Sequence, residues 1–374
     1  MKPFEIPVSV PAEDLSHFAL VGAGLLSRLG QEIKRNHPYA SRVALVSDDN
    51  VMPLYGKQAR ETLEAAGLDV IAIEIPHGEK SKSPAQLLKL IEHYLRSGLS
   101  RKDVIVSLGG GVICDLAGLS ASLFMRGIGL VHCPTSLLAQ VDASVGGKVA
   151  VDLHGETLSA KNVLGNFYFP SVVIADTSLL KSLPDEEIAS GLGEMIKHAA
   201  LFSEEHFDHL VDAADGIYAR DSELLAKLVA TSMNYKARCV SKDPMEHHRR
   251  GKGRIVLNLG HTVGHAIESM SNYEVGHGQA VGLGLIAAAR ISERKKLCAP
   301  GLEDRMSKAL SALRLPTDLD RWCHSSHSKA MEQALGLDKK RMCASIAYVG
   351  LSKLGESSIL ELKPPEIVAL LRSS

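Results

Sequence analysis

The sequence predicts an α/β nucleotide-binding domain built on a parallel sheet, followed by a mainly α-helical domain that binds a metal. Short aliphatic runs alternate with helical patterns through the first half of the chain, and helical periodicity takes over beyond Pro184. The helical half also carries glycine-flanked histidines and a glutamate, which are common metal ligands. At 374 residues the chain exceeds what one hydrophobic core usually supports, so we expect two domains, residues 1–180 and 181–374, with a ligand cleft between them.

The first half has the strand and helix rhythm of a parallel sheet. β-Branched and aliphatic runs predict strands at 42–47, 69–74, 103–108, 127–134 and 171–176. Helical patterns at 55–66 and 83–97 lie between the first three of these runs. The third strand runs directly into Gly109, Gly110 and Gly111, so a tight turn is expected at its carboxyl end.

The second half is dominated by helical patterns. Helices are expected at 186–202, 222–241, 262–270 and 279–295. From Pro300 onward we expect further helices, the last of which runs from Pro364 and Pro365 to Arg372. No internal repeat or low-complexity segment interrupts either half.

The composition narrows the classes of partner. The 42 basic and 43 acidic residues balance without a long run of either sign, which argues against nucleic acid or a membrane surface. The six cysteines lack paired CxxC spacing, so reduced thiols are expected rather than disulfides or a structural zinc site. The sequence shows no signal peptide and no membrane-spanning run, and we expect a cytoplasmic enzyme that acts on a small molecule.

The histidine pattern indicates a metal site. His261 and His265 are four residues apart in a helical segment, so their rings share one face of the helix. His277 lies between two glycines, and Glu194 lies in a glycine-rich segment upstream. A pair of histidines at this spacing usually marks a solvated face or a helix cap, but three histidines with a glutamate suit a catalytic zinc. The spacing does not decide whether His261 or His265 is the ligand.

Two segments in the first half suit a nucleotide. The turn at 109–111 lets backbone amides approach a pyrophosphate at a helix N-terminus, and Asp115 adds a polar group just inside that helix. The glycine spacing differs from the Rossmann fingerprint, and a plain tight turn is an equally good interpretation. The segment 47–50 follows the first predicted strand, where a ribose or adenine would be recognised, although an N-cap cluster explains it equally well.

Several polar segments suit an anionic substrate. The stretch 134–148 packs hydroxyls, an aspartate and a lysine around glycines, which is costly in a core and useful in a site. Cations are scattered downstream at Lys161, Lys197, Lys236, Arg254 and the pair Lys339 and Lys340. Each alone is most simply a solvated surface residue, and only together do they suggest an anion pocket. Lys197 lies one helical turn after Glu194, so both side chains are expected to face the same site.

These residues resemble the 3-dehydroquinate synthase family of sugar-phosphate cyclases, from about Asp48 to Lys340. The motifs that carry the resemblance are residues 76–82, 109–118, 125–127, 134–148, 161–162, 191–197, 257–268 and 277–278. The resemblance implies an NAD-binding α/β domain joined to a helical domain with a divalent metal, usually zinc, with Co²⁺ as an alternative. It also implies a homodimer.

The resemblance implies roles for individual residues at matching positions. It assigns the metal to Glu194, His261 and His277, and gives His265 a contact with the substrate. The NAD contacts it implies are Asp48, Glu79, Lys82, Gly109, Gly110, Gly111, Asp115, Thr135, Ser136, Asp142 and Lys161. The substrate contacts it implies are Lys148, Lys161, Asn162, Lys197, Lys236, Arg254, Asn258, His265 and Lys339. Arg126 corresponds to an arginine that the partner subunit lends.

The activity implied by the resemblance accounts for this set of residues. Family members convert 3-deoxy-D-arabino-heptulosonate 7-phosphate to 3-dehydroquinate and phosphate in the shikimate pathway, with transient reduction of NAD. Phosphate elimination needs cations such as Lys148 and Arg126 to position the leaving group and disperse its charge. The substrate carboxylate needs a clamp, for which Lys236 and Arg254 are suited.

The chain departs from the family pattern in three places. The segment 152–160 is a few residues longer than usual and ends in Ala160 instead of a glycine, so a reshaped substrate-facing loop is expected. The segment 242–252 is also longer, is rich in basic residues and replaces the usual Asp-Glu. Gln279 stands where a glutamate is usual, and if that carboxylate orients His277, its loss would weaken metal binding by about ten- to a hundredfold.

Three other functions fit parts of the pattern. The departures also suit a sister cyclase that acts on another ketose phosphate, although a substrate without a carboxylate has no need of Arg254. A metal-dependent polyol or alcohol dehydrogenase shares the glycine turn and the helical metal domain, but it would release NADH. A catalytically weakened NAD-binding homologue would bind metal without turnover.

Overall fold

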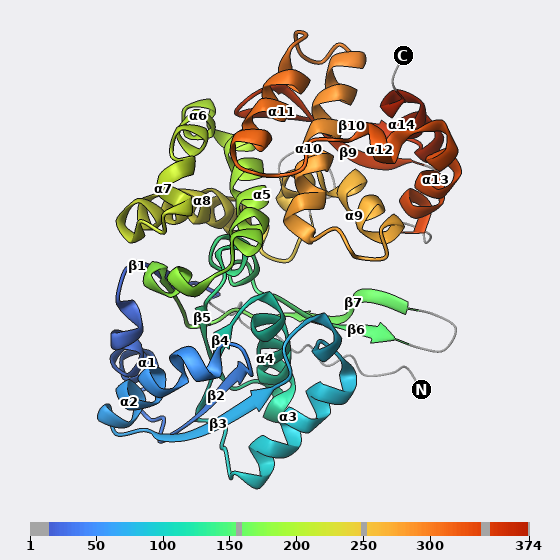
Figure 1. Ribbon diagram of the computed structural model, residues 1–374. Helices are drawn as coiled ribbons and strands as arrows, with labels where there is room; N and C mark the ends of the chain where they lie inside the picture. The colour runs from blue at the N-terminus through green and yellow to red at the C-terminus, as the bar shows by residue number, and fades with distance from the viewer. Residues whose placement is uncertain (1–14, 155–158, 248–252, 338–344, 373–374) are drawn as a thin grey trace, which may run out of the picture.

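The computed structural model describes residues 15–154, 159–247, 253–337 and 345–372. Figure 1 shows an α/β half, coloured blue to green, beneath a half made mostly of helices, coloured yellow-green to red. The predicted combination of an α/β half and a mainly helical half is therefore confirmed. No helix in the described ranges is long and apolar enough to cross a membrane.

A six-stranded parallel sheet forms the centre of the first half, in the order β1-β8-β5-β4-β2-β3. Its strands are β1 (Phe18–Gly22), β2 (Arg42–Asp48), β3 (Asp69–Ile75), β4 (Val104–Gly109), β5 (Gly129–Pro134) and β8 (Val172–Asp176). Five of these strands match the predicted runs within two residues at each end. The sequence analysis overlooked β1, a short edge strand that pairs with β8 and has no alternating pattern to distinguish it.

Helices cover both faces of this sheet, which is why its inner strands β2, β4, β5 and β8 are almost entirely buried. Val43 and Leu45 of β2 point into a core with α1 (Leu29–Asn36) and α2 (Lys57–Ala65). Ala44 and Val46 point into a second core with α3 (Pro84–Arg96) and α4 (Gly111–Leu123). Parallel strands buried on both faces give continuous aliphatic runs, and this pattern made them predictable.

An antiparallel hairpin that the sequence analysis did not predict extends from the side of the α/β half (Figure 1). It consists of β6 (Lys148–His154) and β7 (Ser159–Phe167), which are paired up to His154 and Ser159. The pairing is irregular at Asp152, because Val151 pairs with Leu164 and Leu153 pairs with Ala160. Residues 161–163 therefore bulge out of β7. The lengthened segment 152–160 thus extends a hairpin, and the structure does not describe residues 155–158 within it.

The second half is mainly helical, as predicted. Its helices are α5 (Asp185–Phe202), α6 (Glu204–Asp212), α7 (Ala214–Tyr218), α8 (Ser222–Lys242), α9 (His261–Met270), α10 (His277–Arg294), α11 (Leu302–Ala312), α12 (Asp320–Cys323), α13 (Ser328–Leu337) and α14 (Pro364–Leu371). The helices expected after Pro300 are present, but a hairpin that the sequence analysis did not predict lies among them. A hairpin of β9 (Ile346–Lys353) and β10 (Glu356–Leu362) precedes α14, and its apolar side chains join the helical core. Its short runs were too ambiguous to separate from helix.

Candidate active site

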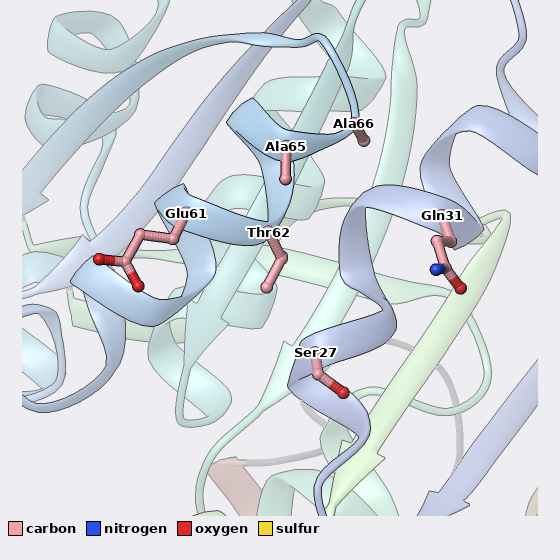
Figure 2. A pocket seen from close by; sticks show the side chains of 6 residues that line it. All are labelled: Ser27, Gln31, Glu61, Thr62, Ala65 and Ala66. Carbon is pink, nitrogen blue, oxygen red and sulfur yellow. The ribbon is translucent and has the colours of Figure 1, made fainter.

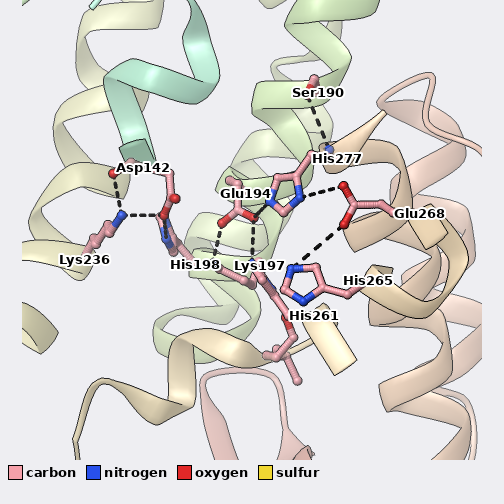
Figure 3. A network of polar contacts seen from close by, with 12 residues as sticks. Asp142, Ser190, Glu194, Lys197, His198, Lys236, His261, His265, Glu268 and His277 are labelled. Atoms are coloured by element: carbon pink, nitrogen blue, oxygen red, sulfur yellow. Dashed lines mark hydrogen bonds and ion pairs between the residues drawn. The ribbon is translucent and has the colours of Figure 1, made fainter. Parts of the chain in front are cut away.

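Three helices bring a glutamate and two histidines together in the helical half (Figure 3). Glu194 lies on α5, His261 is the first residue of α9, and His277 is the first residue of α10. Glu194 Oε1 lies 3.5 Å from His261 Nε2 and 3.4 Å from His277 Nε2. One potential ligand atom from each residue lies within 4.8 Å of the others, so the three side chains face a common point.

Close contact between the backbones of α5 and α10 produces this convergence. A Cβ atom on Gly193 would lie 2.2 Å from the carbonyl oxygen of Gly278, and one on Gly278 would lie 1.8 Å from that of Ser190. Any larger side chain would force the helices apart. Each glycine is the immediate neighbour of a proposed ligand, Glu194 or His277, so the helix contact sets the separation of the two ligands.

Gly278→Ala is therefore expected to lower both the free energy of unfolding and the affinity for zinc. Overpacking a tight contact costs about 1–3 kcal/mol, and the same displacement separates His277 from Glu194. Denaturant unfolding and zinc titration would measure the two effects. Gly336→Ala on α13 is the matched control, because no atom lies within 4 Å of its added Cβ. A normal zinc affinity in Gly278→Ala would contradict the role of the helix contact.

The charges at this point suit a cation. Glu194 is fully buried, and its carboxylate faces the Lys197 ammonium and the rings of His261 and His277. Burial alone would raise the pKa of Glu194, but the Lys197 ammonium and the two histidines hold it well below its usual range. Burial lowers the pKa of His261 to about 3, so its ring is neutral at pH 7. An ionised carboxylate and a neutral imidazole are the ligand forms that zinc needs, and Glu194 and His261 are in these forms. The two donors therefore fit a divalent metal, which would displace the proton from His277 Nε2 on binding.

A second carboxylate, Glu268 on α9, lies behind this group. Its Oε1 is 3.3 Å from His277 Nδ1, and its Oε2 is 4.0 Å from His265 Nε2. Burial alone would lower the pKa of His277, but Glu194 and Glu268 together raise it to about 10. The sequence analysis gave Glu268 no role. Its position three residues after His265, on the same helical face, was the available signal.

The ammonium of Lys236, which was predicted to bind the substrate carboxylate, is paired with Asp142. Its ammonium lies 2.7 Å from Asp142 Oδ1 and also contacts the main-chain oxygen of Asp142. Asp142 belongs to a short turn at 139–143, and His198 Nε2 lies 3.9 Å from its carboxylate. Burial raises the pKa of Asp142, but the Lys236 charge lowers it below its usual range. Lys236 is thus half of a buried ion pair in the described chain.

Arg254 is held at the junction of the two halves. It is 3% exposed, its Nη1 donates to the carbonyl oxygen of Pro244 at 2.9 Å, and its guanidinium lies 5.7 Å from the Phe167 ring centroid. Asn258 ends the same short helical segment, 254–258, and is partly buried. Lys148 is exposed and forms an ion pair with Glu246 from the lengthened segment 242–252. That segment therefore contributes a carboxylate to the site.

The glycine turn lies at the carboxyl end of β4, as predicted. Gly110 precedes α4 and makes no side-chain capping hydrogen bond, so the first amides of that helix remain available to a phosphate. A Cβ on Gly110 would lie 3.5 Å from Ser136 Oγ, and the Thr135 amide donates to the Gly109 carbonyl oxygen at 3.0 Å. The turn therefore leaves space for a pyrophosphate next to the amides at the start of α4.

A polar network connects this turn to the bulge in β7. Lys82 Nζ lies 2.6 Å from Asp115 Oδ2 and donates to Asn162 Oδ1. The Asn162 amide donates to Asp152 Oδ1 at 2.7 Å, and the Asn162 φ angle is 54°. Lys161, beside it, places its ammonium 4.0 Å from the ring centroid of Tyr273, between α9 and α10. The bulge thus contacts both halves of the chain.

Four of the predicted site residues are not part of these groups. Asp48 Oδ1 accepts hydrogen bonds from the amides of residues 50 and 51, which is the capping role considered above. Glu79 is exposed on a short helical turn at 79–81. Arg126 is exposed beyond the end of α4, about 20 Å along that helix from the glycine turn. Lys339 lies outside the described residues.

A shallow pocket lies elsewhere, between the first two helices (Figure 2). Its volume is about 340 Å³, and its lining residues are Ser27, Gln31, Glu61, Thr62, Ala65 and Ala66. None of the proposed site residues lines it, so it is separate from the candidate active site.

Comparison with known proteins agrees with this geometry. Two family profiles match, "3-dehydroquinate synthase N-terminal" over residues 72–190 and "3-dehydroquinate synthase C-terminal" over residues 191–341. The 3-dehydroquinate synthase of Symbiobacterium thermophilum is 41% identical over 350 residues, covering 93% of this chain and 94% of that protein. That of Dehalococcoides mccartyi (strain CBDB1) is 37% identical over 356 residues, covering 94% and 95%.

Solved structures of related cyclases share the fold. A 2-deoxy-scyllo-inosose synthase complexed with carbaglucose-6-phosphate, NAD⁺ and Co²⁺ is 25% identical, with a TM-score of 0.81 and 95% coverage of both chains. The 2-epi-5-epi-valiolone synthase of Streptomyces hygroscopicus subsp. jinggangensis 5008, with NAD⁺ and Zn²⁺ bound, is 24% identical, with a TM-score of 0.84 and 98% coverage of both chains.

Proposed function

The chain belongs to the 3-dehydroquinate synthase family, and we propose that it converts 3-deoxy-D-arabino-heptulosonate 7-phosphate to 3-dehydroquinate and phosphate with NAD and a divalent metal. The convergence of Glu194, His261 and His277 beside buried cations carries the proposal, because it provides both a metal site and an environment for an anionic substrate. Curated relatives with this activity cover more than nine-tenths of the chain.

The cofactors would be bound in different halves of the chain. Glu194, His261 and His277 would hold the metal, with zinc and cobalt supported by the related cyclases. The amides at the start of α4, with Asp115, Thr135 and Ser136 nearby, would hold the pyrophosphate and ribose of NAD. When bound, NAD provides a reversible hydride acceptor and the metal provides a Lewis acid for the adjoining oxygen.

The remaining cations would orient the substrate and disperse the charge of the leaving phosphate. Lys197 is 1% exposed and contacts Glu194, so its ammonium would lie next to a substrate oxygen at the metal. Lys148 would have to exchange Glu246 for the phosphate. Lys161 and Asn162, held in the bulge, would contact the substrate from the opposite side. The Asp142 ion pair leaves Arg254 as the better candidate for the carboxylate clamp.

Arg254→Lys is expected to raise KM by about tenfold to a hundredfold. Lysine keeps the positive charge but loses the paired donors of a guanidinium. Each charge-assisted hydrogen bond contributes about 1.5–3 kcal/mol, which sets the size of the expected change. Steady-state kinetics of phosphate release would measure the change. Arg238→Lys, the same replacement at an exposed position on α8, is the control. An unchanged KM in Arg254→Lys would refute the clamp.

The proposed assembly is a homodimer in which Arg126 serves the neighbouring active site. Arg126 is exposed, and the length of α4 separates it from the glycine turn of its own chain. Exposed apolar side chains lie close to it in sequence, at Leu123 and Met125, and on β7, at Val163 and Leu164. Within the described residues β7 pairs only with β6, so an edge of the hairpin is also available to a partner.

Mixing two inactive variants tests this arrangement. Arg126→Ala and His261→Ala each disable a site, but a mixed dimer contains one site with both residues intact. Random reassembly is expected to restore about one quarter of the wild-type activity, since half of the dimers are mixed and each has one intact site. Assay after denaturation and joint refolding would measure the recovery. No recovery from mixed dimers that are shown to form would place Arg126 in its own subunit's site, and full activity of Arg126→Ala alone would place it in neither site.

We place the domain boundary at residues 180 and 181, between β8 and α5. We place the enzyme in the cytoplasm, which the free thiols of Cys114, Cys133, Cys239, Cys298 and Cys323 support, because reduced cysteines are usual there.

The activity is tested by following phosphate release and NADH absorbance together. Purified protein with NAD and zinc should release phosphate from 3-deoxy-D-arabino-heptulosonate 7-phosphate without accumulating NADH, and a chelator should stop the reaction. Steady growth of NADH absorbance would instead support a dehydrogenase. Failure to release phosphate from this substrate by zinc-loaded protein would overturn the proposed substrate.

A further inference from the structure

The His277 ring lies between two carboxylates (Figure 3). Its Nε2 is 3.4 Å from Glu194 Oε1, and its Nδ1 is 3.3 Å from Glu268 Oε1. Glu268 lies on α9 and His277 begins α10, so the contact crosses the turn between these helices. Glu268 is 7% exposed, and its charge is therefore poorly screened by solvent.

This arrangement determines which nitrogen of His277 is available. A histidine that ligates through Nε2 carries its proton on Nδ1, and an acceptor at Nδ1 fixes both that tautomer and the ring orientation. His261 has such an acceptor in the carbonyl oxygen of Leu259, 3.2 Å from its Nδ1. Glu268 occupies the corresponding position for His277 and, as a carboxylate, is the stronger acceptor.

Residue 279 does not take this position. Gln279 has no side-chain hydrogen bond to a described residue, and its Oε1 lies 3.9 Å from the place a Cβ on Gly276 would occupy. The sequence analysis had connected a carboxylate at 279 with the orientation of His277. The structure instead places Glu268 at the Nδ1 atom.

We propose that Glu268 is a positioning residue that holds His277 in its metal-binding orientation, and that the chain therefore needs no carboxylate at position 279. The inference rests on the proposed metal site. On this proposal, glutamine in place of glutamate at position 279 does not change the affinity for the metal. Glu268 raises that affinity because it orients the His277 ring.

Zinc titration against a chromogenic chelator tests the proposal with a matched pair of variants. Glu268→Gln keeps the shape of the side chain but removes its charge, and it is expected to weaken zinc binding by about ten- to a hundredfold. Gln279→Glu restores the family's usual carboxylate and should leave the affinity unchanged. Equal zinc affinity in Glu268→Gln and the wild type would overturn the proposal, as would a tenfold gain in Gln279→Glu.

Two further measurements separate positioning from packing. Glu268→Asp keeps the carboxylate, so its zinc affinity should lie between those of the wild type and Glu268→Gln, and equal losses in both variants would indicate packing alone. The visible spectrum of the cobalt-loaded protein should change in Glu268→Gln, because the histidine ligand is perturbed, and an unchanged spectrum would contradict the role. Failure of the wild type to bind zinc would overturn the proposed metal site itself.

Discussion

His261→Ala is expected to lower kcat/KM by about a thousandfold or more, because the variant loses a metal ligand. The metal acts as a Lewis acid that supplies several kcal/mol of charge stabilisation in the transition state, and each 1.36 kcal/mol is a factor of ten in rate. The His261 ring is one of three side chains that face the proposed metal position, and its Nε2 lies 3.5 Å from Glu194. The zinc content of the purified variant and its kinetics with added zinc would measure the loss.

The fold should survive this substitution. Burial keeps His261 neutral, so its removal leaves no additional unpaired charge, in contrast to a change at Glu194, which would strand the buried Lys197. His93→Ala on α3 provides an exposed histidine as the control. Normal turnover in His261→Ala would refute the metal assignment.

The two halves of the fold were predictable for different reasons. Strands such as β2 and β4 are buried on both faces, so their aliphatic runs are unbroken and their bounds could be placed within two residues. The long helices α5 and α10 were equally clear from periodicity. The hairpin of β6 and β7 was not, because its pairing depends on a bulge of residues 161–163 and on the contact of Asp152 with the Asn162 amide, which spacing does not reveal.

The site was predictable as a set of residues but not as a set of contacts. Spacing alone left His261 and His265 as equal candidates, and in the structure His261 faces Glu194 whereas His265 is directed toward Glu268. The sequence also did not show which residues the predicted cationic side chains contact. Lys236 and Asp142 are 94 residues apart in sequence, and only the packing of α8 against the turn at 139–143 brings them together. Such long-range pairs leave no periodic signal.

Lys236→Met is expected to lower the free energy of unfolding by about 3–5 kcal/mol, because breaking a buried ion pair leaves the other charge uncompensated. Lys236 is 6% exposed, and Asp142 is its closest carboxylate, at 2.7 Å. Lys227→Met removes an exposed lysine from the same helix and should change stability by less than about 0.5 kcal/mol. Denaturant unfolding of the two variants would give the comparison.

The double variant Lys236→Met with Asp142→Asn separates the ion pair from packing. Removing both charges leaves no stranded carboxylate, so the double variant should be more stable than Lys236→Met alone, and the cycle should give a coupling of about 2 kcal/mol or more. Additive losses would mean that Lys236 stabilises through its aliphatic stem, and its ammonium would then be free to serve as the substrate clamp. Strong coupling would instead assign Lys236 to holding Asp142 beside the glycine turn, leaving the carboxylate of the substrate to Arg254.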